Sequence, residues 1–265
     1  MELKQFKALW GLEGTYAEQF ARIGEAGYDG LEAPAPSEDR AEEFSSLLEK
    51  YRLEYIVQVF AATEADFREQ VSYAARFKPL KIVAHSARDS MPEAEQDRFF
   101  AAALETEARY GIPIGHESHR QRAMFTPWTT ARLLKRFPEL RITADFSHWM
   151  NVCESHLEDQ KENLAIAVER AIHIHGRIGY PEGPQVPHPG APEYRTELEL
   201  FLGWWKDILA RQASEGAAFA TFTSEFGPPG YLHTLPYTQS PVADLWEVNR
   251  WMSDHVQERF AGWKL

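Results

Sequence analysis

The sequence predicts a single (β/α)8 barrel, the TIM barrel architecture, and three observations support this fold class. The chain has 265 residues, which is the usual size of one such barrel and enough for a large core. Strand-like and helix-like segments alternate along it, as is typical of a parallel sheet built from βα units. Four apolar runs in the second half each end on a potential metal ligand or acid/base residue, as expected at the face where such barrels build active sites.

The segments follow one another in an order that gives eight βα units within one domain, residues 1–265. The expected strands cover residues 6–10, a segment ending at 31–33, 54–60, 81–85, 112–117, 141–145, 171–175 and 218–225. The expected helices cover residues 16–26, 38–51, 65–76, 91–110, 128–137, a segment within 157–170, 196–212 and 241–260. In the first of these helices Phe20 and Ile23 have the spacing of one buried face.

Glycine and proline mark several of these boundaries. The segment Gly27-Tyr28-Asp29-Gly30 is expected to turn into the second strand. Gly111 is expected to end the fourth helix, and Pro127 lies in the first turn of the next one, where its missing N–H costs nothing. Residues 176–194 are rich in Pro and Gly and have no periodicity. Because loops this long are usually functional, we expect this segment to cover the substrate.

Composition and charge exclude several function classes. The formal net charge is −12, from 40 acidic and 28 basic residues, so tracking a phosphate backbone of DNA or RNA is not expected. The one cysteine, Cys153, allows no intrachain disulfide, and an inert buried thiol is expected. No apolar stretch reaches the ~18 residues of a membrane span, and the first residues lack the apolar core of a signal peptide. A cytoplasmic enzyme is therefore expected.

Four strand-end residues are the candidate metal ligands: Glu117, Asp145, His175 and Glu225. A carboxylate that ends a buried strand needs a partner, because an unpaired buried charge is costly. Two Glu, one Asp and one His form a mixed oxygen and nitrogen set that suits one divalent cation. The alternative is that each residue pairs with an Arg or Lys, or is solvated. His173 lies deeper on the same side of its strand as His175, and is expected to be a core histidine.

A second group of residues is expected to bind the substrate near these ligands. His85, His119, His148 and Arg177 supply hydrogen-bonding or cationic groups that suit a polyhydroxylated substrate. Trp10 and Trp149, at predicted strand ends, are candidates for an apolar wall against the carbon face of a sugar. The remaining candidates are weaker: Glu32, as a partner of His85, of the substrate or of a backbone amide, and Arg120, Arg122, Phe226 and Tyr231.

At these residues the sequence resembles the xylose isomerase-like TIM barrels, which include sugar isomerases, ketose 3-epimerases, inosose dehydratase-like proteins and endonuclease IV. The resemblance covers nearly the whole chain and depends on six markers in order: 27–32, 85–86, 117–120, 145–148, 173–175 and 224–225. It implies one divalent ion, Mn, Mg, Co or Zn, on Glu117, Asp145, His175 and Glu225. It also implies acid/base roles for Glu117 and Glu225 and a substrate contact for His148.

Three positions depart from the epimerase pattern, and one of them is the extra aromatic Trp149 directly after His148. Pro181 stands where that branch carries an Arg six residues after the metal-binding His, and the nearest Arg is Arg177. Ala123 stands where the branch has a second Glu. The resemblance therefore supports the metal site more strongly than it supports any particular substrate.

The resulting functional prediction is a metal-dependent sugar isomerase or epimerase. It would transfer a proton next to the carbonyl of a ketose, inosose or related polyol-derived substrate, through an enediolate. The alternatives are a dehydratase (lyase) on the same substrates and a barrel or subunit that only binds sugar. A phosphodiesterase like endonuclease IV is less favoured by the negative charge. By analogy with relatives, a homodimer or homotetramer is expected.

Overall fold

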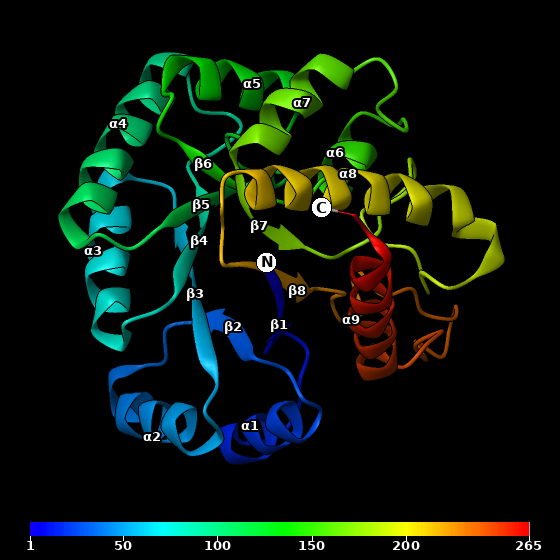
Figure 1. Ribbon diagram of the computed structural model, residues 1–265. Helices are drawn as coiled ribbons and strands as arrows, with labels where there is room; N and C mark the ends of the chain where they lie inside the picture. The colour runs from blue at the N-terminus through cyan, green and yellow to red at the C-terminus, as the bar shows by residue number, and fades with distance from the viewer. Residues whose placement is uncertain (265) are drawn as a thin grey trace.

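Eight parallel strands close into a barrel in chain order in the computed structural model, which describes residues 1–264 (Figure 1). The strands are β1 (Glu2–Ala8), β2 (Gly30–Pro34), β3 (Glu54–Ala61), β4 (Lys81–Ser86), β5 (Ile114–Glu117), β6 (Arg141–Ala144), β7 (Ala171–His175) and β8 (Phe219–Ser224). The ring is closed by the pairing of β1 with β8, which runs from Glu2 opposite Phe219 to Lys7 opposite Ser224. The predicted fold class is confirmed.

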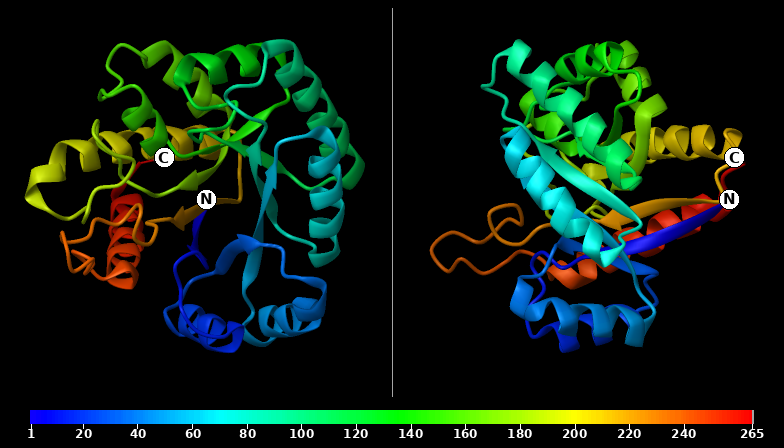
Figure 2. Two further views of the ribbon diagram at one scale, coloured as in Figure 1. Left: turned by 180° about the vertical axis from the view of Figure 1, so that it is seen from behind. Right: turned by 90° about the vertical axis from the view of Figure 1, so that its left-hand side faces the viewer.

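Helices surround the barrel, and Figure 2 shows them outside the strands from two further directions. They are α1 (Tyr16–Glu25), α2 (Ala41–Tyr51), α3 (Glu64–Ala74), α4 (Glu93–Tyr110), α5 (Pro127–Arg136), α6 (Ser147–Val152), α7 (Lys161–Arg170), α8 (Arg195–Ser214) and α9 (Leu245–Gly262), with short 3-10 turns η1 (Glu38–Arg40), η2 (Ala75–Phe77) and η3 (Pro192–Tyr194). None of the helices in residues 1–264 combines the length and apolarity needed to cross a membrane.

Local sequence signals fix several helix ends. Thr15 and Glu18 form a capping box at the start of α1, an arrangement that typically contributes about 1 kcal/mol. Thr126 caps α5, whose first residue is Pro127. Gly111 ends α4 with a φ of 66°, in the left-handed region where a side chain is strained. The expectations for Gly111 and Pro127 are therefore confirmed.

The core has two layers because successive strand residues point to opposite faces. Inside the barrel, Phe6, Ile56 and Val83 form a small cluster of fully buried side chains. A much larger cluster fills the space between strands and helices, and Phe20 and Ile23 of α1 belong to it. Their predicted buried face is confirmed.

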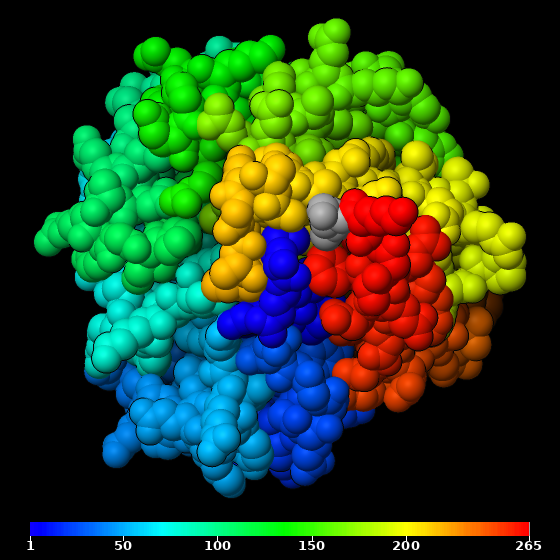
Figure 3. Space-filling model, in the orientation of Figure 1, coloured from blue at the N-terminus to red at the C-terminus, as the bar shows by residue number. Residues whose placement is uncertain are grey.

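The two ends of the barrel differ. Figure 3 shows the end where the N-terminal residues lie at the centre, beside the C-terminal helix α9. At the opposite end, where the strands finish, the long loop after β8 extends away from the barrel (Figure 2, right). The carboxyl ends of the strands therefore open toward the loops, where active sites of this fold are found.

Some predicted boundaries were wrong. β1 ends at Ala8, so Trp10 lies in the following turn rather than on the strand. The expected helix 241–260 begins only at Leu245, where Asp244 provides the N-cap. The short helix α6 was not expected, because its six residues are too few to show a helical period. This helix matters because it carries His148 and Trp149.

Candidate metal centre and active-site cavity

Four acidic and imidazole side chains meet at the carboxyl end of the barrel. Glu117 and His175 are the last residues of β5 and β7, and Asp145 and Glu225 directly follow β6 and β8. One ligand atom of each lies within 4.8 Å of the others, and all four residues are buried. The structure thus brings together the residues that the sequence grouped as metal ligands.

His175 lies at the centre of this cluster, between three carboxylates. Its Nε2 is 2.9 Å from Oε1 of Glu32, and its Nδ1 is 2.9 Å from Oε2 of Glu225 and 3.4 Å from Oε1 of Glu117. Burial disfavours the charged imidazole, but the surrounding carboxylates of Glu225, Glu32 and Glu117 raise the pKa of His175 well above its ordinary value. In the absence of a cation, His175 therefore carries a positive charge that neutralises part of the acidic cluster.

Glu32 lies beneath the cluster as a fully buried acceptor. Its carboxylate accepts hydrogen bonds from Nε2 of Gln58 at 2.9 Å and from Oγ1 of Thr223 at 2.6 Å. It also contacts Nε2 of both His173, at 3.1 Å, and His175. Burial opposes ionisation, but the two histidines lower the pKa of Glu32 below its ordinary range. The roles considered for Glu32 from the sequence were wrong, because it supports the histidines of β7.

Asp145 is held by its own set of donors. The backbone N–H and the hydroxyl of Ser147 donate to Oδ1 at 3.1 Å and 2.5 Å. Oδ2 forms an ion pair with the guanidinium of Arg177, whose Nε donates to Oγ of Ser147 at 3.1 Å. Burial raises the pKa of Asp145 to about 6 even though Arg177 acts in the opposite direction. A cation at this site would therefore share or displace the contact between Asp145 and Arg177.

Several buried atoms of the cluster have no hydrogen-bond partner among the described residues. They are both oxygens of Glu117, Nδ1 of His175 and Oε2 of Glu225. The contacts of these carboxylate oxygens include ion pairs with the imidazoles of His85 and His175 that lack hydrogen-bond geometry, and a divalent ion would give each of these atoms a ligand contact. Donation of the Nε2 proton of His175 to Glu32 would leave Nδ1 free as a ligand, an arrangement typical of metal-binding histidines. The donor set and its orphaned atoms fit the expected ion.

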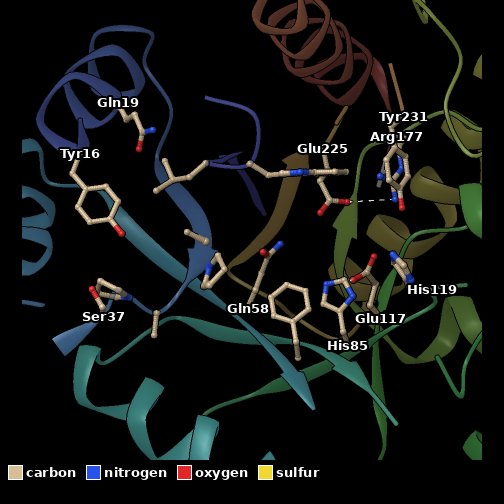
Figure 4. A pocket seen from close by; sticks show the side chains of 17 residues that line it. Tyr16, Gln19, Ser37, Gln58, His85, Glu117, His119, Arg177, Glu225 and Tyr231 are labelled. Carbon is tan, nitrogen blue, oxygen red and sulfur yellow. Dashed lines mark ion pairs between the residues drawn. The ribbon is translucent and has the colours of Figure 1, made fainter. Parts of the chain in front are cut away.

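A cavity of about 510 Å³ opens above this cluster (Figure 4). Glu117 and Glu225 line it, together with four residues that the sequence proposed for substrate binding: His85, His119, Arg177 and Trp10. Arg177 lies 3.7 Å from Oε2 of Glu225, the contact drawn as a dashed line in Figure 4. Tyr231, a weaker candidate, stacks over the guanidinium of Arg177, with 4.7 Å from Cζ to the ring centroid.

Two histidines flank Glu117 in the cavity wall. Nε2 of His85 lies 2.8 Å from Oε2 of Glu117, and the His85 ring stacks on Phe60 at 4.3 Å between centroids. Burial lowers the pKa of His119 to about 4 although Glu117 opposes this shift. His119 is therefore a neutral hydrogen-bonding group at neutral pH, whereas His85 supports the carboxylate directly.

Two other candidates do not reach the cavity. Trp149 is fully buried, donates from Nε1 to the carbonyl of Met124 at 2.9 Å and stacks on Phe146. The expected sugar contact of Trp149 is corrected, because α6 turns this ring into the core. His148 is also fully buried and lies behind Arg177, with 2.7 Å between its Nε2 and a guanidinium nitrogen. His148 can therefore influence a substrate by positioning the guanidinium of Arg177, which lines the cavity.

Other sequence expectations have mixed outcomes. His173 is a core histidine as expected, with Nδ1 2.7 Å from Oγ1 of Thr221. Cys153 is half-buried, and burial raises the pKa of its thiol to about 11, which fits an inert residue. Of residues 176–194, which were expected to cover the substrate, Arg177 lines the cavity. The side-chain amide of Gln185 instead pairs with the backbone of Gly227.

One wall of the cavity was not predicted from the sequence. It comes from the first three βα units and includes Tyr16, Gln19, Ser37, Gln58 and Phe60. One usable signal was Gln58, a polar residue within the otherwise apolar run of β3. The other four lie in helices or loops, or look like ordinary core residues, so their position at a cavity depends on the closed barrel.

Comparisons with known proteins agree with this architecture. The family model described as xylose isomerase-like TIM barrel matches residues 20–183, more than half of the chain. No curated protein matches the chain. Among solved structures, it is similar to the probable 3-DHS dehydratase AsbF of Bacillus anthracis, with 15% identity, a TM-score of 0.63 and coverage of 97% of this chain and 99% of that one.

Two further solved structures have the same fold. An AP endonuclease, family 2, from Brucella melitensis has 14% identity, a TM-score of 0.62 and coverage of 96% and 98%. A sugar phosphate isomerase/epimerase from Parabacteroides distasonis has 12% identity, a TM-score of 0.60 and coverage of 97% and 93%. At these identities the similarities establish the fold, and the chemistry must be argued from the site.

Proposed function

Because the chain belongs to the xylose isomerase-like TIM barrel family, we propose that it is a metal-dependent isomerase or epimerase. It moves a proton at the carbon next to a carbonyl, on a ketose, inosose or related polyol-derived substrate. The observation that carries this proposal is the convergence of four buried ligand atoms, from Glu117, Asp145, His175 and Glu225, within 4.8 Å of one another. Two of these residues also line the cavity.

These four residues would hold one divalent ion, Mn, Mg, Co or Zn. When bound, such an ion supplies an electrophile that polarises the substrate carbonyl and favours the negative charge of an enediolate. Oxygen ligands from three carboxylates and one imidazole nitrogen suit each of these ions. Glu32 would hold His175 in the required orientation through its contact with Nε2.

Glu117 and Glu225 are the proposed acid/base pair, because they alone of the four ligands reach the cavity. Burial raises the pKa of Glu117, but His85, His175 and His119 outweigh it and hold this pKa well below its ordinary value. Glu117 is therefore ionised at neutral pH and can accept a proton. Glu117 would keep the proton it takes up, and the protonated carboxyl of Glu225, which follows β8, would donate its own proton to the carbanionic carbon; exchange with water then resets both groups. Return to the opposite face gives epimerisation, and return to the neighbouring carbon gives isomerisation.

The other cavity residues would orient the substrate. His119, neutral at physiological pH, can hydrogen-bond a hydroxyl of the substrate. Trp10 and Tyr231 meet edge to face with 5.0 Å between ring centroids, and both line the cavity. Aromatic rings in this position can cover the apolar face of a sugar and keep water away from the reacting carbons.

The test combines metal analysis with hydrogen exchange. Elemental analysis of purified protein, with and without EDTA, should find about one divalent ion per chain. The reloaded protein should exchange a substrate C–H for deuterium in a panel of ketoses and inososes, and only when metal is present. Water loss from a panel member would point to a dehydratase instead. Metal and sugar binding without exchange would leave a sugar-binding barrel, and about three zinc ions per chain would favour phosphodiester hydrolysis.

A further inference from the structure

The cavity has two chemically different ends, which Figure 4 shows facing each other. At one end lie the reacting groups Glu117 and Glu225 with His85 and Arg177. At the other end lie side chains of the first three βα units, among which Tyr16 and Ser37 are labelled in Figure 4. A substrate with its carbonyl at the reacting end must place its far carbons, here called the tail, at this second end.

The tail end offers no cation to an anionic group. Among the described residues that line the whole cavity, Arg177 is the one Arg or Lys, and it lies at the reacting end. Arg177 is also 1% exposed and committed to the carboxylate of Asp145. A phosphate ester at the tail would therefore find no Arg or Lys in the lining to pair with, whereas an uncharged tail needs none.

Cations just outside the tail end are already paired with acids. The guanidinium of Arg40 lies over the ring of Tyr16, at 4.6 Å, but its Nε is 2.6 Å from Oε2 of Glu43. Arg76 makes two hydrogen bonds, of 2.6 Å and 2.9 Å, to the carboxylate of Glu38. Both guanidinium groups are exposed and paired, so an anion would have to compete with Glu43 or Glu38 for them.

The N-termini of α1 and α9, a kind of site that often binds phosphate, are occupied by acids of this chain. At the start of α1, the backbone N–H and hydroxyl of Thr15 both donate to Oε2 of Glu18 at 2.8 Å. At the start of α9, after β8, Asp244 accepts from the backbone N–H of Glu247 at 2.9 Å. In many barrels the phosphate is bound by the loops after the seventh and eighth strands, and here the segment after β8 leads to the carboxylate of Asp244 at the N-cap of α9.

The groups that remain at the tail end suit an uncharged molecule. Nε2 of Gln19 donates to the carbonyl of Leu12 at 2.9 Å, and its Oε1 has no partner among the described residues. That oxygen is buried, but the hydroxyls of Tyr16 and Ser37 line the cavity and can bind hydroxyl groups. Phe60, which is 42% exposed, adds an apolar surface.

We propose that this cavity selects an unphosphorylated substrate with an uncharged, partly apolar tail, and rejects a phosphate or carboxylate at that end. The proposal depends on the proposed function for the location of the reacting carbons. It narrows the substrate class to free sugars, deoxysugars and cyclic polyol ketones. Ser37 is the position from which this selectivity can be changed, because it is exposed, precedes η1 and makes no side-chain capping bond.

The test uses ligands that differ only at the carbon farthest from the carbonyl. These are D-fructose, 6-deoxy-D-fructose and D-fructose 6-phosphate, with the matching D-xylulose series. Binding to the Mn-loaded protein is measured by calorimetry, and deuterium exchange is measured separately. In at least one series the uncharged members should bind at least about tenfold more tightly than the phosphate. Ser37→Arg should reduce this preference, whereas Ser72→Arg, on the exposed face of α3, should leave it unchanged.

The two measurements separate this proposal from the proposed function. Equal or tighter binding of the phosphate esters, or no binding by any uncharged member, would overturn the selectivity. Exchange confined to phosphate esters would also overturn it while supporting the proposed chemistry. Preferential binding of uncharged members without any deuterium exchange would support the selectivity and contradict the proposed isomerase or epimerase activity.

Discussion

The carboxylate of Glu32 and the Nε2 of His175 are 2.9 Å apart and fully buried. This contact decides which nitrogen of His175 faces the acidic cluster. It directs Nδ1 toward Glu117 and Glu225, and Nε2 toward the interior of the barrel. Glu32 therefore acts on the candidate metal site through His175 rather than by contact with a substrate.

Replacement of Glu32 by Gln should weaken metal binding. The neutral amide has one oxygen in place of the two charged oxygens that accept hydrogen bonds from His173, His175 and Thr223. His175 therefore loses the partner that holds its orientation. Loss of such a supporting group typically costs about 10–100-fold in metal affinity. The Mn²⁺ affinity is measured by calorimetric titration of the metal-free protein.

The matched control for this variant is Glu197→Gln. Glu197 contacts Nε2 of His156 at 2.8 Å, far along the chain from the proposed ligands, so its replacement should leave the Mn²⁺ affinity unchanged. Wild-type affinity in Glu32→Gln would show that His175 needs no support from Glu32.

The ion pair between Arg177 and Asp145 predicts that a metal and a guanidinium compete for one carboxylate. Arg177→Met should destabilise the metal-free protein by about 3–5 kcal/mol, because it leaves a buried acid without its partner. Added Mn²⁺ should restore part of this loss, so the metal should raise the melting temperature of the variant more than that of the wild type. An equal rise in both proteins would argue against competition at Asp145.

Replacement of Glu225 by Gln, measured at saturating Mn²⁺ with the bound metal quantified, tests its proton-transfer role separately from its role as a proposed ligand. The amide keeps the size of the side chain but cannot transfer a proton, so deuterium exchange should fall by about 10²–10⁴-fold. The melting temperature of the metal-free protein should change little. Glu139→Gln is the control, since Glu139 is exposed and lies outside the cavity. Exchange near the wild-type rate would remove Glu225 from the reaction.

The barrel and the convergence of the four proposed ligands could be predicted from the sequence because both follow from short-range patterns. Alternation of segments determines a parallel sheet, and parallel strands bring their ends to one side. Side-chain direction beyond a strand end could not be predicted in the same way. Trp149 and Trp10 looked equivalent in the sequence, but α6 turns Trp149 inward while the turn after β1 leaves Trp10 39% exposed. The tail end of the cavity was missed because its residues meet only after the barrel closes.

This difference between the two tryptophans leads to opposite expected phenotypes. Trp149→Phe loses the hydrogen bond to Met124 and buried volume, so it should destabilise the fold by about 1–3 kcal/mol without changing KM. Trp10→Ala should raise the KM of the exchange reaction several-fold with little effect on stability. Trp128→Ala, at an exposed site outside the cavity, controls for general loss of an aromatic ring. A raised KM in Trp149→Phe would contradict its placement in the core.

Lys7 gives a prediction about pH. It is 1% exposed, and its Nζ donates to the carbonyl of Ala8 at 2.7 Å. Burial lowers its pKa from 10.5 to about 7, although Glu225 raises it. Below pH 7 the Lys7 ammonium is charged in both the folded and the unfolded chain, and its burial destabilises the folded state. Between pH 7 and 10.5 the unfolded chain binds more protons, so this group makes the free energy of unfolding rise with pH.

Lys7→Met should remove that pH dependence. The variant keeps a long side chain in the same space without a buried charge, so it should be more stable than the wild type at pH 7, by about 1–3 kcal/mol. The difference should shrink toward pH 10. Urea unfolding at pH 7, 8, 9 and 10 measures this, with the exposed Lys161→Met as control. A constant difference across these pH values would show that Lys7 titrates alike in the folded and unfolded chain.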